Sequence, residues 1–231
     1  MSLQTRFRYI DIITAFFVFV LIVSNVASSA KIIDLGVSIL GVRLAFDGGT
    51  LLFPLSYVIG DVLTEVYGFR PSRRVIWTGF AMLALSSGLF LVLRILPADA
   101  EWESYAGQAA FDAILGGMSS GGIALASLAG YLIGEFSNSI TLVWIKKATN
   151  SRFLWVRTIG STLVGEFLDS LVFVLIASLT GVFGWELFKT LVLTNYLFKC
   201  VIEVLMTPAT YLAVFQLKKR ERTFVESRQG E

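Results

Sequence analysis

The sequence contains no histidine, and its 231 residues include only one cysteine, Cys200. Without histidine, the chain cannot form imidazole zinc sites, Ser-His-Asp triads or histidine proton relays. A single cysteine cannot form an intramolecular disulfide, so we expect Cys200 to be a small buried side chain. The phosphate-binding pattern G-x-x-x-x-G-K-[ST] is also absent, which excludes ATP hydrolysis by that route. We expect no cofactor.

Charge is scarce as well. Charged residues make up 16% of the chain, whereas a soluble domain keeps roughly a quarter. The net charge of +2 gives no electrostatic basis for nucleic-acid binding. Hydrophobic residues make up 55% of the chain and come in long blocks, each near the ~20 residues that cross a bilayer as a helix. The composition therefore predicts an all-α integral membrane protein embedded in the lipid bilayer.

We predict six transmembrane helices and, because the first apolar run is too long for a signal peptide, we interpret it as a permanent span. Residues 1–217 would form one transmembrane domain, and residues 218–231 a basic cytoplasmic tail. The second span is the least hydrophobic. The predicted spans are Tyr9–Ala30, Thr50–Val66, Val75–Leu96, Gly121–Ile145, Phe153–Leu179 and Leu187–Leu217.

Lysine and arginine alternate from one connection to the next. By the positive-inside rule, this alternation predicts that both termini are cytoplasmic. Only Lys31 and Arg43, in the first outer connection, depart from it. The residues that carry the pattern are Arg6, Arg8, Arg70, Arg73, Arg74, Lys146, Lys147, Arg152, Arg157, Lys218, Lys219, Arg220 and Arg222. The outer segment Pro97–Gly117 mixes aromatic residues with acids, which is typical of a short interfacial helix or of a lid.

Acidic residues occur inside the predicted spans. A charge near the bilayer centre costs at least ~2.5–3.5 kcal/mol, so such residues face the bundle interior and usually serve function. In the second span Phe53, Tyr57, Asp61 and Glu65 follow one another at intervals of four, which places them on one helical stripe. An alternative for Glu65 is an interfacial acid close to the Arg70–Arg74 cluster.

The fourth and fifth spans each carry a polar pair at a spacing of three. The pairs are Glu135 with Asn138, and Glu166 with Asp169. Two carboxylates as close as those of the fifth span would repel, so at least one must be protonated, paired or strongly hydrogen-bonded. A stripe of small residues, Gly122–Gly134, precedes Glu135 and predicts close helix packing, either within the chain or between subunits.

The sixth span supplies the candidate partner. Asn195, Lys199 and Glu203 lie four residues apart, and Lys199 is the only basic residue well inside a span. We expect Lys199 to bridge Glu203 or an acid of the second or fifth span. Pro208 is expected to kink the helix. Near the outer end of the first span, Asn25 adds hydrogen-bonding capacity.

A weak repeat connects the buried acids. The segments 60–65, 134–139 and 165–170 read GDVLTE, GEFSNS and GEFLDS, and each begins with glycine followed by an acid. Transporters are often built from duplicated units that present equivalent groups around a central cavity. The repeat therefore favours an internal duplication and a small-molecule transporter.

Three parts of the chain resemble a known family. The stretch FPLSYVIGDVLTEVYG at 53–68 resembles the signature of the queuosine precursor transporters, also called the vitamin uptake transporter family. GEFLDS at 165–170 and the pattern Asn195, Lys199, Glu203, Pro208 are similar to the same family. The resemblance covers nearly the whole chain. It implies a bacterial inner-membrane importer of 7-cyano-7-deazaguanine or 7-aminomethyl-7-deazaguanine, used in salvage for transfer RNA modification.

The buried residues suit such a substrate. A carboxylate such as Glu166 or Asp169 accepts the two adjacent donors of a deazaguanine. Asn138, Asn195 or Lys199 would reach its carbonyl, and an aromatic ring would stack on its plane. The predicted substrate-binding set is Asn25, Phe53, Tyr57, Asp61, Glu65, Tyr131, Glu135, Asn138, Glu166, Asp169, Asn195, Lys199 and Glu203.

Several alternatives stay open. The chain could work alone, coupled to protons through a buried carboxylate, or it could be the substrate-binding subunit of an energy-coupling-factor type vitamin transporter that needs an ATPase module. It could also form a homo-oligomer. We do not expect an enzyme, and the remote alternative is an intramembrane enzyme with a metal held by Asp61, Glu135, Glu166 and Asp169.

Overall fold

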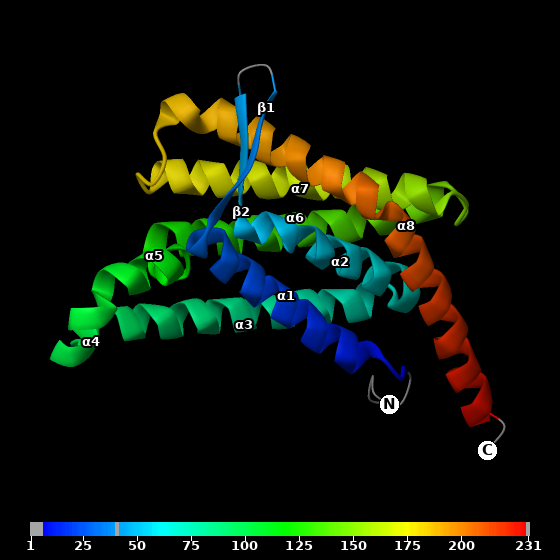
Figure 1. Cartoon of the computed structure of the whole chain (residues 1–231). Helices are drawn as coiled ribbons and strands as arrows, with labels where there is room; N and C mark the ends of the chain where they lie inside the picture. Colours follow the sequence, from blue (N-terminus) through cyan, green and yellow to red (C-terminus); the bar gives the residue numbers. More distant parts are fainter. Residues whose placement is uncertain (1–6, 40–41, 230–231) are drawn as a thin grey trace.

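The computed structural model describes residues 7–39 and 42–229, so Arg6 lies outside the described residues. Long helices dominate it (Figure 1). The elements in chain order are α1 (Ile10–Ala30), β1 (Ile32–Ile39), β2 (Val42–Asp47), η2 (Gly48–Leu51), α2 (Phe53–Tyr67), α3 (Phe69–Ile95), α4 (Ala100–Tyr105), α5 (Gly107–Ser119), α6 (Gly121–Ala148), α7 (Leu154–Leu179), η3 (Trp185–Leu187) and α8 (Phe188–Gln229).

Within residues 7–39 and 42–229, five helical stretches are long and apolar enough to cross a membrane. They are Ile10–Ser28, Phe69–Ile95, Gly107–Ala148, Leu154–Leu179 and Leu191–Arg222. Large apolar side chains on these helices face outward, among them Trp144 at 74% exposure and Leu205 at 72%. Such surfaces are expected where a helix faces lipid. The prediction of a multi-pass helical membrane protein is therefore confirmed.

The second predicted span is the exception, because α2 has only 15 residues. At 1.5 Å per residue it is about 22 Å long, short of the ~30 Å hydrocarbon core. Pro54 lies in its first turn, where a proline costs no helical hydrogen bond. Twelve residues of α2 are buried, and α2 packs against α1, α3, α6 and α8. It is therefore an internal helix of the bundle.

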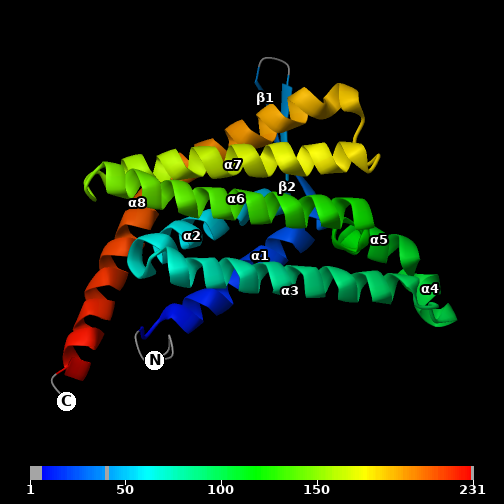
Figure 2. The same ribbon diagram turned by 180° about the vertical axis from the view of Figure 1, so that it is seen from behind.

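The long helices run back and forth between two ends of the molecule. Figure 1 shows both ends of the chain at the same end of the bundle, together with the α2–α3 and α6–α7 connections, and it shows α4 at the opposite end. Figure 2 shows the same arrangement from behind. Helix α3 begins six residues before the predicted span, so Arg70, Arg73 and Arg74 lie in its first turns and not in a loop.

The connection between α1 and α2 contains a β-hairpin that the sequence analysis did not predict. Strands β1 and β2 pair antiparallel, with Ile32 opposite Asp47 and Ile39 opposite Val42. The register shifts between Asp34 and Ser38. The segment carries isolated apolar residues and no long apolar run, so span-length hydropathy gives no signal for it.

The predicted interfacial segment forms two helices. Helix α4 has no buried residue, and the Asp99 side chain caps it by accepting from the backbone N–H groups of Glu101 and Trp102. Helix α5 instead packs against α1 and α3. Arg94 of α3 donates to Asp112 of α5 at 2.9 and 3.3 Å, which fixes α5 to the bundle.

Helix α8 continues without interruption from Phe188 to Gln229 and contains Pro208. Figure 1 shows that α8 bends partway along its length. A proline inside a helix removes one backbone hydrogen bond and clashes with the preceding turn, which accounts for a bend of this kind. The basic residues from Lys218 onward are therefore part of the helix that carries Lys199.

Candidate functional site

The three glycines that precede buried acids lie at close contacts of α6 with α2 and of α6 with α7. A methyl group added at Gly60 would lie 2.8 Å from an oxygen of Glu135. One added at Gly134 would lie 3.1 Å from the backbone oxygen of Gly165, and one at Gly165 would lie 2.8 Å from Cβ of Asn138. Small residues of this kind allow two helix backbones to touch. The glycine-acid repeat therefore brings the acids of three helices together.

The small-residue stripe of α6 makes the same kind of contact along its length. A methyl group at Gly122 would lie 2.8 Å from the hydroxyl of Thr180, and one at Gly130 would lie 2.8 Å from an oxygen of Asp169. Asp169 belongs to α7 and Thr180 is the residue that ends it, and α7 is the helix that α6 contacts most extensively. Between the two predicted alternatives, the stripe serves an internal contact.

Lys199 of α8 lies between two acids of α7. Its ammonium group is 3.0 Å from Oε2 of Glu166 and forms a second ion pair with Asp169. The same group lies 5.5 Å from the centre of the Phe53 ring, within the range of a cation–π interaction. The prediction that Lys199 bridges an acid of the fifth span is confirmed.

Asp61 and Asn138 form the second polar contact of the cluster. Asn138 donates from Nδ2 to Oδ1 of Asp61 at 2.8 Å, and neither residue is exposed. The other carboxylate oxygen of Asp61 and the amide oxygen of Asn138 have no hydrogen-bond partner among the described residues. Helices α2 and α6 are thus joined by a contact that leaves two acceptors facing the protein interior.

Two further acids form no ion pair and no hydrogen bond of ordinary geometry within the described part of the chain. Both carboxylate oxygens of Glu135 and both of Glu203 are buried and make no hydrogen bond. An unsatisfied buried polar group costs roughly 1–3 kcal/mol, and more when it is charged. Native structures keep few such groups, so a concentration of them indicates a place for a ligand or water. Three hydroxyls nearby share this state: Tyr57, Thr162 and Ser170.

The central cluster is the set defined by these contacts, from α2, α6, α7 and α8. It contains five carboxyl groups and one ammonium group, so its acids outnumber its bases. Its members are Phe53, Tyr57, Asp61, Glu135, Asn138, Glu166, Asp169, Lys199 and Glu203.

Three predicted site residues make no hydrogen bond or ion pair with the central cluster among the described residues. Asn25 donates to the backbone of Leu21 and accepts from Ser127 at 2.6 Å, so it ties α1 to α6. Tyr131 donates to the backbone oxygen of Ile76 in α3 at 3.0 Å. Asn195 is half-buried and makes no side-chain hydrogen bond with the described residues. Their part in substrate binding stays a prediction.

Glu65 lies one turn beyond Asp61 in a different environment, which we call the Glu65 clasp. Arg157 of α7 donates to its two carboxylate oxygens at 2.8 and 3.0 Å. Lys146 of α6 lies 3.2 Å away, and Lys218 of α8 also pairs with it. The ion-pair partners of Glu65 come from α6, α7 and α8 and not from the Arg70–Arg74 cluster named in the alternative.

Sequence reasoning missed Arg157 as a partner. It was counted among loop charges, yet it lies within the predicted span Phe153–Leu179 and is only 4% exposed. Its position inside a predicted span was the signal that could have found it. Its remaining donor bonds the backbone oxygens of Ser151 and Arg152 at 3.1 and 3.0 Å, which satisfies the buried guanidinium.

Glu221 of α8 was also missed. Its carboxylate accepts from the backbone N–H groups of Arg8 and Tyr9 at 2.9 and 3.0 Å, and from the hydroxyl of Tyr67 at 2.8 Å. The first N–H groups of a helix lack partners within it and favour negative charge. The two donors stand just before Ile10, the first residue of α1, so Glu221 places its carboxylate as a cap at the N-terminal end of this helix and joins α1, α2 and α8.

The described residues contain no group of three or more His, Cys, Asp or Glu side chains arranged to hold a metal ion. The carboxyl groups of Glu166 and Asp169 are directed to the ammonium of Lys199. Two of the four acids named in the metal-enzyme alternative are therefore paired with a lysine. The carboxylate arrangement of this chain thus differs from the one that the metal-enzyme alternative requires.

Comparison with known proteins identifies relatives that match most of the chain. Residues 47–213 match the family model described as "Putative vitamin uptake transporter". The "Probable queuosine precursor transporter" of Bacillus subtilis (strain 168) is 27% identical over 177 residues, 76% of this chain and 74% of the relative. The "Queuosine precursor transporter" of Escherichia coli (strain K12) is 26% identical over 181 residues, 78% and 76% of the two chains.

A third relative covers more of the sequence. The "Probable queuosine precursor transporter" of Haemophilus influenzae (strain ATCC 51907 / DSM 11121 / KW20 / Rd) is 24% identical over 225 residues, 94% of this chain and 91% of the relative. No solved structure matches the chain. Together with the five membrane-length helices, these relatives make the chain a multi-pass protein of the bacterial inner membrane. The chain belongs to the vitamin uptake transporter family.

Proposed function

We propose that this protein imports queuosine precursors, 7-cyano-7-deazaguanine or 7-aminomethyl-7-deazaguanine, across the inner membrane for transfer RNA modification, and that the central cluster holds the substrate. The observation that carries the proposal is the set of buried acceptors without partners, above all the two oxygens of Glu135 and the two of Glu203. The names of the three relatives support the substrate class. A transporter, and not an enzyme, agrees with the family.

The proposed topology has six crossings with both termini in the cytoplasm. Helix α2 would be the short crossing, completed by η2 and the α2–α3 connection and shielded from lipid by its neighbours. Short or interrupted helices at membrane depth are tolerated where protein surrounds them, and transporters place substrate sites beside them. The glycine-acid segments of α2, α6 and α7 would be remnants of an internal duplication.

The deazaguanine ring would lie among α2, α6 and α8. Its ring N–H and exocyclic amine are adjacent donors, and a carboxylate accepts both at once. We assign this role to Glu135, because both of its oxygens are buried and unpartnered. Lys199, held by Glu166 and Asp169, would donate to the carbonyl oxygen. The Phe53 ring, already beside the ammonium of Lys199, would stack on the base.

The test is uptake of radiolabelled 7-cyano-7-deazaguanine into proteoliposomes that contain only this protein. Replacing Glu135 by glutamine exchanges one acceptor for a donor, so uptake should fall about 10- to 100-fold, the worth of a hydrogen bond to a charged group. Replacing exposed Glu101 by glutamine is the matched control and should leave uptake unchanged. Unchanged uptake in the Glu135→Gln variant, with the double variant Glu166→Gln/Asp169→Asn also unaffected, would refute the proposed site.

The energy source is part of the same test. Uptake that responds to an imposed proton gradient would make the protein a self-sufficient secondary transporter, with a carboxyl group of the cluster carrying the proton. Binding without uptake would favour the second candidate, a substrate-binding subunit that awaits an ATPase module. Six crossings and a polar interior serve either role, so co-purification with ATPase subunits distinguishes them. A homo-oligomer would be detected in the same preparation by its mass.

A further inference from the structure

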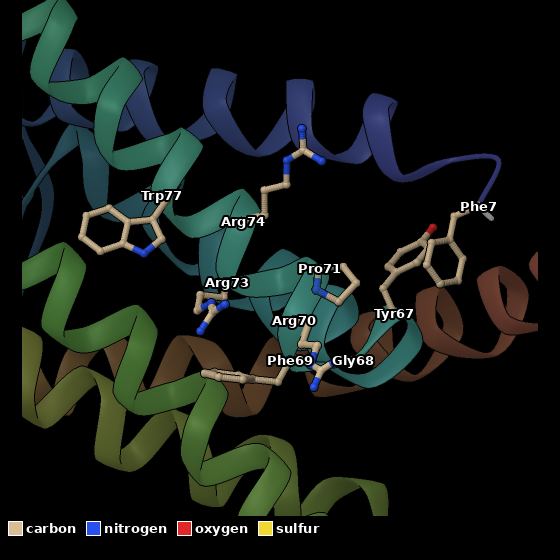
Figure 3. Close-up of a pocket in the computed structure, with 9 residues that line it drawn as sticks. All are labelled: Phe7, Tyr67, Gly68, Phe69, Arg70, Pro71, Arg73, Arg74 and Trp77. Carbon is tan, nitrogen blue, oxygen red and sulfur yellow. The ribbon is translucent and has the colours of Figure 1, made fainter. Parts of the chain in front are cut away.

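A cavity lies away from the central cluster, at the end of the bundle where both chain termini are found. It has a volume of about 690 Å³ and is formed around the α2–α3 junction. Figure 3 shows its lining, in which Arg70, Arg73 and Arg74 of α3 occur with the aromatic side chains of Phe7, Tyr67 and Trp77. None of these residues belongs to the central cluster, so the proposed transport site does not account for the cavity.

No carboxylate among the described residues pairs with the three arginines. All three are exposed, and the ion pairs and hydrogen bonds of the described residues include no carboxylate partner for them. Their placement is locally unfavourable, because like charges three and four residues apart on a helix repel. They also lie in the first turns of α3, where the helix dipole disfavours cations. An external anion would remove each of these costs.

The walls of the cavity indicate what kind of anion it accepts. Phe7 packs edge-on against Tyr67, with ring centres 4.9 Å apart, and Trp77 is 50% exposed one turn beyond Arg74. Trp and Tyr collect at the level of lipid headgroups. A free phosphate would gain nothing from aromatic walls, whereas an anion attached to acyl chains would contact both features. A deazaguanine carries no negative charge and does not fit this requirement.

The arginines flank the cavity and do not converge on one point. Figure 3 shows Arg74 extending toward α1, and Arg70 and Arg73 extending to the other side of α3. We propose that this cavity binds the phosphate headgroup of an anionic phospholipid from the cytoplasmic leaflet. Basic pockets between helices at this surface are suited to such headgroups. The choice of leaflet rests on the topology given under the proposed function, but headgroup binding itself does not.

The experiment is native mass spectrometry of the full-length protein in detergent, titrated with phosphatidylglycerol or with phosphatidylcholine. The intact protein should bind phosphatidylglycerol in clear preference to phosphatidylcholine. Each arginine near a headgroup contributes about fivefold in affinity. The triple variant Arg70→Gln/Arg73→Gln/Arg74→Gln should therefore weaken phosphatidylglycerol binding on the order of 100-fold, and Arg73→Gln alone should weaken it about fivefold. The single variant keeps the test valid if the triple variant fails to fold.

The matched control removes three exposed charges from the same end of the molecule but outside the cavity, as Lys147→Gln/Arg152→Gln/Arg220→Gln. Its affinity should stay within about twofold of the unmodified protein. Equal losses in both triple variants would mean general surface attraction and would overturn the proposal. Complete displacement of the lipid by millimolar inorganic phosphate would mean a free-phosphate site and would also overturn it. Lipid binding is measured without substrate, so this result is independent of the uptake assay.

Discussion

Replacement of Glu65 by glutamine should destabilise the protein more than replacement of either lysine that pairs with it. The Glu65 carboxylate has no exposure, and the Arg157 side chain is 5% exposed. The two residues share two hydrogen bonds. The paired lysines are nearer to water, with Lys146 at 30% and Lys218 at 45% side-chain exposure. The burial of an ion pair, and not the number of charges in it, should therefore decide how much the pair contributes to the free energy of unfolding.

The magnitudes follow from this difference in burial. Removing one partner of a buried ion pair leaves an uncompensated buried charge, which costs about 3–5 kcal/mol. An exposed pair contributes roughly 0–1 kcal/mol. In a chain of this length, 1 kcal/mol corresponds to roughly 2–4 °C in Tm. The Glu65→Gln variant should thus melt about 6–20 °C lower, whereas Lys218→Gln should lower the Tm by no more than about 4 °C.

Thermal unfolding of the purified protein in detergent measures both effects. A double-mutant cycle with Arg157→Met measures the coupling between the two residues. The losses of unfolding free energy in the two single variants, added together, should exceed the loss in the double variant by at least about 2 kcal/mol. Equal Tm shifts for Glu65→Gln and Lys218→Gln would refute the reasoning from burial. Additivity within about 0.5 kcal/mol in the cycle would refute the direct coupling of Glu65 to Arg157.

Three further outcomes are expected. Lys199→Met leaves two buried acids without a counter-charge and should reduce proteoliposome uptake at least about tenfold, whereas exposed Lys189→Met should not. Gly134→Ala places a methyl group 2.6 Å from a tyrosine oxygen and should cost about 1–3 kcal/mol in thermal unfolding. Gly88→Ala meets no atom within 4 Å and should be neutral or slightly stabilising. Glu221→Gln weakens the cap of α1, and the amides at the start of that helix should exchange with solvent about fivefold faster, equivalent to roughly 1 kcal/mol.

The helical membrane class and the buried acids of the cluster could be predicted, because the cost of placing charge in a membrane strongly restricts where acids occur in a sequence. Acids are costly in lipid, so Asp61, Glu135 and Glu166 had to face the interior, and each is buried. With one lysine inside a span, its partner had to be an acid, and Lys199 pairs with two of them. These inferences depend on composition and spacing within single helices.

The sequence does not show which helices contact one another. The spacing of α6 residues does not say which helix faces Gly134, and charges near a span end do not say which of several cations reaches Glu65. Arg157 was assigned to a loop because a basic residue near the end of a span usually lies in a cytoplasmic loop. The Glu221 cap joins residues more than 200 positions apart, a separation that no local pattern records.

Helix α2 shows why depth matters as much as spacing. A helix enclosed by other helices does not need an apolar surface toward lipid, so α2 carries polar residues at a density that an exposed span could not tolerate. Asp61 and Glu65 occupy the same stripe of this helix, and a helical wheel treats them as equivalent. Asp61 lies in the central cluster opposite Asn138, whereas Glu65, one turn further along, is neutralised by cations of three helices. The two carboxylates are one turn of helix apart, about 5.4 Å. Asp61 keeps an acceptor without a hydrogen-bond partner among the described residues, whereas Glu65 forms ion pairs that join α2 to α6, α7 and α8.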